Sequence, residues 1–158
     1  MSVARFISCD PEEPPASELL AEMAAELNAL YRTSSRLDLP LVHPSELRPP
    51  SGVYLVGWEG ELALAGGAFR HLDDEVAEIK RMFVRPSARS RGIAGELLAA
   101  LESSARQLGY RRLRLDTGPK QVHALNLYRR AGYVPVDPYN DNPFACFWGE
   151  KEIDRSLS

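Results

Sequence analysis

The sequence predicts an α+β fold: one domain over residues 1–158, in which helices flank a central mixed sheet of about six to seven strands, mostly antiparallel with one parallel pair. Three observations favour this class. Strand-like segments follow one another between residues 53 and 85 with only short turns between them, which is typical of an antiparallel meander. A long helical segment then leads to the next strand, so this strand should pair parallel to the preceding one through a right-handed crossover. The length and the 44% hydrophobic content suit one globular domain with its own core.

The N-terminal segment predicts a strand, a helix and a loop. Val3 to Ser8 alternates in hydrophobicity as a strand does, and Asp10 to Pro15 is rich in residues that precede helices. A helix to about Tyr31 follows, because apolar side chains form one stripe at helical spacing. Arg32 to Gly52 contains four prolines, so we expect a loop with at most a short helix near Ser45 to Leu47. The stripe consists of Leu19, Leu20, Met23, Ala24, Leu27, Leu30 and Tyr31.

Three strands are predicted next, joined by tight turns. Glu59-Gly60 suits a hairpin turn, and Asp73-Asp74 a second turn. Gly66 and Gly67, inside the second strand, indicate a bulge or a close approach of a neighbouring segment. Pro86 lacks the N–H group that a central strand needs, so the third strand should end just before it. The three strands are Val53 to Trp58, Leu62 to His71 and Val76 to Arg85.

The remaining elements are two helices and three strands. Apolar residues at helical spacing predict a helix from Ile93 to Gly109, with a glycine at its C-terminal end. Arg111 to Thr117 is the strand expected to lie parallel to the preceding one. A short helix is expected from Gln121 to Ala131, ended by Gly132. The last two strands, expected to form a hairpin, are Tyr133 to Val136 and Phe144 to Ile153.

Charge and cysteine content exclude several classes of function. With 19 Lys and Arg against 22 Asp and Glu, the net charge is −3, so neither nucleic acid nor an anionic membrane is an expected partner. We find no run of 18 apolar residues and no signal peptide, so a cytoplasmic protein is expected. Cys9 and Cys146 lie far apart in the sequence. In a reducing compartment we expect two buried thiols rather than a disulfide, and no metal site.

The segment from Ala77 to Gly109 combines a strand, a turn and a helix in an arrangement that suits phosphate. The helix directs its unpaired N–H groups and the positive end of its dipole at the turn, which carries two arginines. Small residues would let a diphosphate approach the backbone. A tight packing turn is the alternative, and the motif G-x-G-x-x-G is absent. The arginines are Arg89 and Arg91, and the small residues are Gly92, Ala94 and Gly95.

Two motifs resemble those of the GNAT superfamily of N-acetyltransferases. Arg89-Ser90-Arg91-Gly92-Ile93-Ala94 matches the signature R/Q-x-x-G-x-G/A. Downstream, ALNLYRRAGY from Ala124 to Tyr133 resembles the motif A-x-x-x-Y-x-x-x-G-F/Y. The resemblance implies a sheet whose parallel pair is splayed into a V, and acetyl-CoA as the acetyl donor.

The resemblance also implies where acetyl-CoA would bind. A backbone N–H near Met82 or Phe83 would meet the thioester carbonyl oxygen. Asn126 would either bind the pantetheine or cap a neighbouring carbonyl. The pantetheine arm would lie along Met82, Phe83 and Val84, and the diphosphate on Arg89, Ser90, Arg91, Gly92, Ile93, Ala94 and Gly95.

Acetyl transfer to an amine needs a base for the ammonium proton and an acid for the departing thiolate. The resemblance places Glu78 where histone acetyltransferases of the family carry a glutamate base, although a strand glutamate is commonly just solvated or ion-paired. It places Tyr128 beside the cofactor sulfur, where a phenol can donate a proton; a core tyrosine is the alternative. His71 and His123 are weaker candidates for an accessory base.

The acceptor is the least defined part of this reading. Arg70 and Arg81 lie on strands next to Glu78 and could bind a carboxylate, while Tyr139 and Asp141 could line the rim; surface ion pairs would explain them equally. We expect an N-acetyltransferase that acts by direct transfer in a ternary complex on a primary amine of a small molecule or peptide, with a homodimer as in many relatives. The alternatives are a non-catalytic acyl-CoA-binding regulatory module and a plain structural domain.

Overall fold

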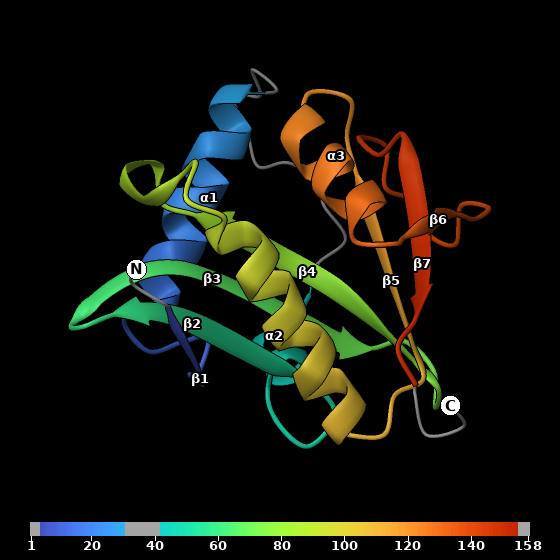
Figure 1. The fold of residues 1–158 in the computed structure, drawn as a ribbon, viewed down its shortest axis with the longest axis horizontal. Coiled ribbons are helices and arrows are strands. Elements are labelled where there is room, and N and C mark those ends of the chain that lie inside the picture. Colours follow the sequence, from blue (N-terminus) through green and yellow to red (C-terminus); the bar gives the residue numbers. More distant parts are fainter. Residues whose placement is uncertain (1–3, 31–41, 155–158) are drawn as a thin grey trace.

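The computed structural model describes residues 4–30 and 42–154, in which seven strands form one sheet with helices on both faces (Figure 1). The strand order is β1-β2-β3-β4-β5-β7-β6, and every neighbouring pair is antiparallel except β4 and β5. The predicted α+β fold with one parallel pair is therefore confirmed. The strands are β1 (Arg5–Ser8), β2 (Val53–Glu59), β3 (Leu62–His71), β4 (Val76–Val84), β5 (Arg112–Thr117), β6 (Val134–Pro135) and β7 (Phe147–Glu152).

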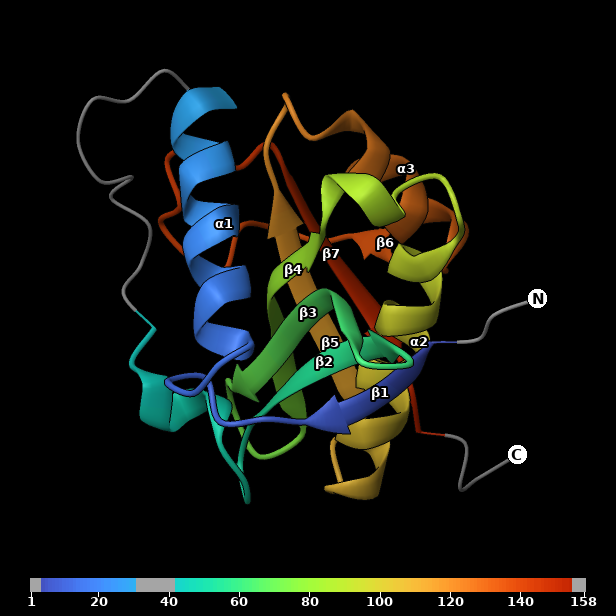
Figure 2. The same cartoon turned by 90° about the vertical axis from the view of Figure 1, so that its left-hand side faces the viewer.

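The helices divide the interior into two cores, one on each face of the sheet (Figure 2). On one face, α1 and the short helix η1 cover a core that includes Leu19 and Tyr54. On the other, α2 and α3 cover a larger core that includes Leu97 and Tyr128. None of the described helices has the length and apolar character of a membrane span. The helices are α1 (Ala16–Leu30), η1 (Pro44–Leu47), η2 (Pro86–Ala88), α2 (Ile93–Gln107) and α3 (Val122–Arg130).

Most predicted elements are present with small shifts at their ends, and the last hairpin is the main correction. β6 has only two residues, and β7 begins at Phe147 rather than Phe144. Pro135, Pro138 and Pro143 cannot donate to a ladder, and the Phe144 N–H bonds to Asn142 Oδ1 at 3.0 Å instead of to a strand. A long loop, residues 136–146, therefore connects the two strands. Val3, Tyr31 and residues 32–41 of the predicted loop lie outside the described residues.

The two cysteines are free thiols, and one of them differs from the prediction. Cys9 is half-buried, whereas Cys146 is exposed. Cys146 belongs to the loop before β7, where its N–H bonds to the Thr117 carbonyl at 2.9 Å while its side chain stays at the surface. The predicted burial is therefore wrong for Cys146.

The paired glycines of β3 mark both a bulge and a close approach. Gly66 pairs with Phe83 and Ala68 with Lys80, so two residues of β4 face one residue of β3. The extra residue thus lies in β4, at Arg81, whose φ of 61° is rare for a residue with a side chain. A β-carbon at Gly66 would lie 2.2 Å from the Tyr54 hydroxyl oxygen, so only glycine fits there.

Two buried tyrosines provide a test of this packing. The Tyr54 hydroxyl has no hydrogen-bond partner among the described residues, whereas the Tyr110 hydroxyl donates to the Ser51 carbonyl at 2.6 Å. Tyr54→Phe removes an unsatisfied buried group and should raise the free energy of unfolding by about 1 kcal/mol. Tyr110→Phe should lower it by about 1 kcal/mol. Urea unfolding measures both, and equal losses in the two variants would contradict the assignment.

Candidate active site

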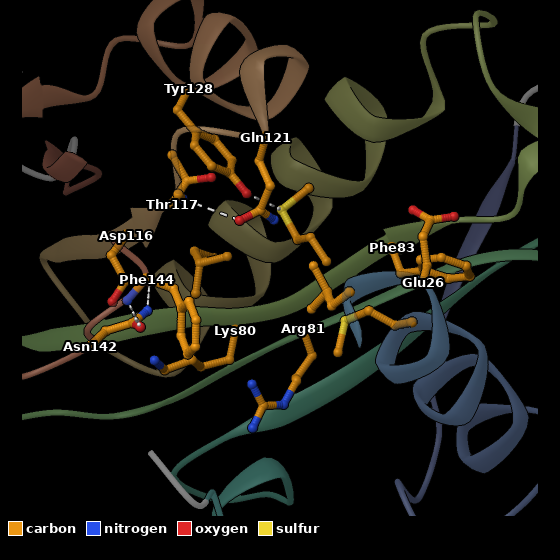
Figure 3. A pocket seen from close by; sticks show the side chains of 15 residues that line it. Glu26, Lys80, Arg81, Phe83, Asp116, Thr117, Gln121, Tyr128, Asn142 and Phe144 are labelled. Atoms are coloured by element: carbon orange, nitrogen blue, oxygen red, sulfur yellow. Dashed lines mark hydrogen bonds between the residues drawn. The ribbon is translucent and has the colours of Figure 1, made fainter. Parts of the chain in front are cut away.

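The parallel strands β4 and β5 enclose a V-shaped opening. They pair only from Val76 with Arg112 to Glu78 with Arg114, and then separate although both strands continue. A pocket opens between the separated arms, with α3 on one side and α1 on the other (Figure 3). It is lined by Met23, Glu26, Leu27, Ile79, Lys80, Arg81, Met82, Phe83, Asp116, Thr117, Gly118, Gln121, Tyr128, Asn142 and Phe144.

Glu78 occupies the apex of the V, and its side chain is completely buried. One carboxylate oxygen accepts a hydrogen bond from Arg70 Nε at 2.9 Å. The other accepts from the Tyr139 hydroxyl at 2.8 Å and from Asn140 Nδ2 at 3.2 Å, with Lys80 Nζ 3.3 Å away. Glu78 does not itself line the pocket. Its charge is held by two cations and two neutral donors at the closed end of the V.

Asp116, near the end of β5, is a carboxylate that does line the pocket. It accepts hydrogen bonds from Asn140 Nδ2 at 2.6 Å and from Asn142 Nδ2 at 3.3 Å, so the Asn140 amide bridges Asp116 and Glu78. Trp148 Nε1 donates to the Asn140 oxygen at 2.9 Å and fixes the orientation of that amide. Within the described residues, no cationic side chain forms an ion pair with Asp116. Sequence reasoning missed this residue, and its place at the end of the predicted parallel strand was the available signal.

Tyr128 lies on α3 and projects into the pocket (Figure 3). The residue is 7% exposed, and its hydroxyl lies 3.8 Å from Met82 Sδ on β4. Burial, followed by the negative charge of Asp116, raises the pKa of the Tyr128 phenol above its ordinary value of about 10. The hydroxyl is therefore protonated at neutral pH, as a proton donor must be.

The turn before α2 leaves its backbone open. Ser90 and Gly92 have φ values of 64° and 78°, and α2 begins at Gly92 without a side-chain cap. A β-carbon at Gly92 would meet nothing within 4 Å, and one at Gly95 only Leu127 at 3.8 Å. The first N–H groups of α2 and the positive end of its dipole thus face an uncrowded turn that suits an anion.

The two arginines of this turn are tied to glutamates of other elements. Arg89 bonds to both oxygens of Glu26 on α1, at 2.8 and 2.7 Å, and donates to the Val84 carbonyl at 2.9 Å. Arg91 is ion-paired with Glu59 at the end of β2. These pairs connect the turn to α1 and to β2. The arginines therefore hold the turn in place, and its backbone forms the surface that a ligand would meet.

The residues predicted for the acceptor occupy different places. Arg70 lies between Glu78 and Glu46, with Arg70 Nη1 2.9 Å from Glu46 Oε1, and Tyr139 donates to Glu78; neither lines the pocket. Arg81 does line it. The remaining candidates, none of which lines the pocket, are exposed: His71, His123, Asn126 and Asp141.

Comparison with known proteins gives consistent matches. The model of the acetyltransferase (GNAT) family matches residues 17–133. An IAA acetyltransferase of Azospirillum brasilense is 33% identical over 144 residues, which are 87% of this chain and 90% of that protein. A solved structure from Klebsiella pneumoniae superposes with a TM-score of 0.74 at 29% identity, covering 96% of this chain and 99% of the other.

A GNAT family acetyltransferase of Elizabethkingia anophelis, solved with acetyl-CoA bound, superposes with a TM-score of 0.65 at 20% identity over 94% of this chain and 97% of that one. At this identity the likeness extends to the fold only. The family match, by contrast, spans the strand, turn and helix that carry the first motif and the helix that carries the second. The chain belongs to the acetyltransferase (GNAT) family.

Proposed function

We propose that this acetyl-CoA-dependent acetyltransferase transfers the acetyl group directly to a primary amine of a small molecule or peptide, within a ternary complex. The observation that supports this best is the pocket between β4 and β5, where the phenol of Tyr128 and the carboxylate of Asp116 line one space. A carboxylate can receive the ammonium proton and a phenol can give one to a thiolate. Both groups that amine acetylation requires therefore line the same pocket, Asp116 from β5 and Tyr128 from α3.

The residues predicted to hold acetyl-CoA fit it in shape and polarity. Pairing between β4 and β5 ends at Glu78, so the β5-facing edge of Met82 to Val84 is available to the amides of a pantetheine arm. The uncrowded turn from Arg89 to Gly95 would take the diphosphate on the N–H groups that open α2. When bound, acetyl-CoA supplies the activated acetyl group. Asn126, exposed on α3, stays a predicted contact of the pantetheine.

We assign removal of the proton from the acceptor's ammonium group to two carboxylates, Asp116 and Glu78, which have different roles. Asp116 faces the pocket and has only amide partners, so it can meet the acceptor directly. Glu78, the predicted base, has two cations and two neutral donors around it and would receive a proton only through water. Tyr128 keeps its role as the general acid on the thiolate side of the pocket.

The non-catalytic acyl-CoA-binding module is the rival reading. It requires the turn before α2 but gives no reason for a protonated phenol and a cation-free carboxylate to line the same pocket. Rapid mixing of the protein with acetyl-CoA and a panel of amines, followed by detection of free thiol, separates the two. The cytoplasmic location and the homodimer stay predictions.

CoA binding at the turn is the first prediction. At about a hundredfold excess over its Kd, CoA should stabilise the fold by about 2.7 kcal/mol and raise the Tm by roughly 5 to 10 °C. Gly92→Ala and Gly109→Ala make a matched pair, because both glycines flank α2 with positive φ and open space. Each should lose about 1 to 2 kcal/mol of stability. Only Gly92→Ala should reduce the Tm shift caused by CoA. Equal Tm shifts in the two variants would mean that the turn is not part of the CoA site.

Loss of the Tyr128 hydroxyl should slow the chemical step. Tyr128→Phe is expected to lower kcat by about a hundredfold or more while the CoA-induced Tm shift is unchanged. Because the pKa of this phenol is raised, the wild-type kcat should show no decline from Tyr128 ionisation up to about pH 10. Tyr133→Phe is the control. The Tyr133 hydroxyl donates a hydrogen bond to Glu102 at 2.9 Å, and Tyr133 does not line the pocket. An unchanged kcat in Tyr128→Phe would place the acid elsewhere.

The two carboxylates should differ in what their loss costs. Asp116→Asn is expected to lower kcat/KM by about a hundredfold. It should lower the free energy of unfolding by only about 1 kcal/mol, because one N–H donor loses its acceptor but no charged group loses its partner. Glu78→Gln leaves Arg70 and Lys80 without their shared carboxylate and should lower the free energy of unfolding by about 3 kcal/mol. Steady-state kinetics and thermal unfolding measure both variants. A slow Glu78→Gln enzyme beside an unaffected Asp116→Asn enzyme would assign the proton to Glu78 alone.

A further inference from the structure

The pocket has an uneven distribution of charge. Four of its lining side chains are charged at neutral pH: Glu26, Lys80, Arg81 and Asp116. Glu26 is paired with Arg89 and Lys80 with Glu78, so these two charges are neutralised by the protein. Within residues 4–30 and 42–154, Arg81 and Asp116 form no ion pair with each other or with any other side chain. The pocket therefore contains one cation and one anion that the described chain leaves without a charged partner.

The backbone conformation that places Arg81 in the pocket is energetically unfavourable. Arg81 is the bulge residue of β4 and has a φ of 61°. For a residue with a side chain, this conformation costs about 1 kcal/mol or more. Burial lowers the pKa of its guanidinium, yet an arginine stays charged at neutral pH. Five N–H donors thus face the pocket without a hydrogen-bond partner in the described chain. Backbone strain together with a cation that forms no ion pair is typical of a residue that binds a ligand.

The charges of Glu78 and Asp116 act on Arg81 from a distance, but within the described residues no acidic side chain forms an ion pair with it. Glu78 already accepts hydrogen bonds from Arg70, Tyr139 and Asn140, and Glu46 is paired with Arg70. Arg70 thus takes the structural role, while Arg81 keeps its guanidinium available. The two arginines looked equivalent in the sequence, and their partners distinguish them.

Asp116 supplies the opposite charge from the other arm of the V. Its carboxylate is oriented by two amides, which carry no charge of their own. In Figure 3, Asp116 lies on β5 below Thr117, and Arg81 on β4 lies on the side of the pocket away from Tyr128. That side is the one left for the acceptor when the thiolate lies next to Tyr128.

We propose that the acceptor is a free α-amino acid, bound as a zwitterion with its α-carboxylate on Arg81 and its ammonium group on Asp116. This inference rests on the proposed N-acetyltransferase function and narrows its acceptor. A guanidinium binds a carboxylate through two parallel hydrogen bonds, which fixes the position of the neighbouring amine. Polyamines, aminoglycosides and the N-terminus of a peptide have an amine but no carboxylate one carbon away. They should therefore be poor acceptors.

The test compares each amino acid with its own α-amide. The full chain is assayed with acetyl-CoA and the twenty amino acids, and thiol release gives kcat/KM for the best amino acid, for its α-amide and for the decarboxylated amine. We expect the amino acid to exceed both analogues by roughly ten- to a hundredfold. Arg81→Gln should remove this preference by slowing the amino acid while leaving the amide unchanged. Arg112→Gln is the control, because Arg112 lies outside the pocket and pairs with Glu75.

Three outcomes would overturn the inference, and they differ in what they mean for the proposed function. Equal kcat/KM for an amino acid and its amide overturns it while N-acetylation stands. A preference for the amino acid that survives in Arg81→Gln overturns the role of Arg81. If no amine in the panel releases thiol, the inference fails together with the proposed transfer. The CoA-induced Tm shift then tells whether donor binding stands.

Discussion

The buried carboxylate of Glu78 is the interaction on which the site depends. A charge without solvent contact is tolerated only when it is paired and hydrogen-bonded, and Glu78 draws these partners from several distant segments. Arg70 comes from β3, Lys80 from β4, and Tyr139 and Asn140 from the loop between β6 and β7. The network therefore joins β3, β4 and the 136–146 loop at the point where β4 and β5 separate.

This arrangement explains why the open arms keep a defined shape. Once the ladder with β5 ends at Glu78, the separated part of β4 stays paired with β3 through Phe83 and Val84. The bulge at Arg81 and the contact of Met82 with Tyr128 then shape its free edge. On the other arm, Asp116 is fixed by Asn140, the same residue that binds Glu78. One amide thus couples the closed end of the V to its open end, and the two arms are oriented by one set of side chains.

The sequence predicted the fold well, including the strand, turn and helix that carry the proposed donor site, because these elements depend on local patterns. Periodicity, Pro86 and the glycine-rich turn set β4, the turn and α2 within a few tens of residues. The acceptor side could not be predicted in the same way. The difference between Arg70 and Arg81 depends on Glu46 and on the 136–146 loop, which approach the sheet from distant parts of the chain. The shortened last hairpin and the exposed Cys146 have the same origin, since both lie in or beside that loop.

The two halves of the pocket are therefore determined by different kinds of interaction. At the turn before α2, the surface consists of backbone N–H groups, and Arg89 and Arg91 are ion-paired with glutamates, so the anion site that we propose there depends on the fold itself. On the acceptor side, the charge of the pocket depends on which acidic and basic side chains form ion pairs with one another. A substitution at Glu46 or in the 136–146 loop could redistribute these charges without changing a strand or a helix. Family membership therefore specifies the donor, and in our proposal the charges of Arg81 and Asp116, which form no ion pair in the described chain, select the amine.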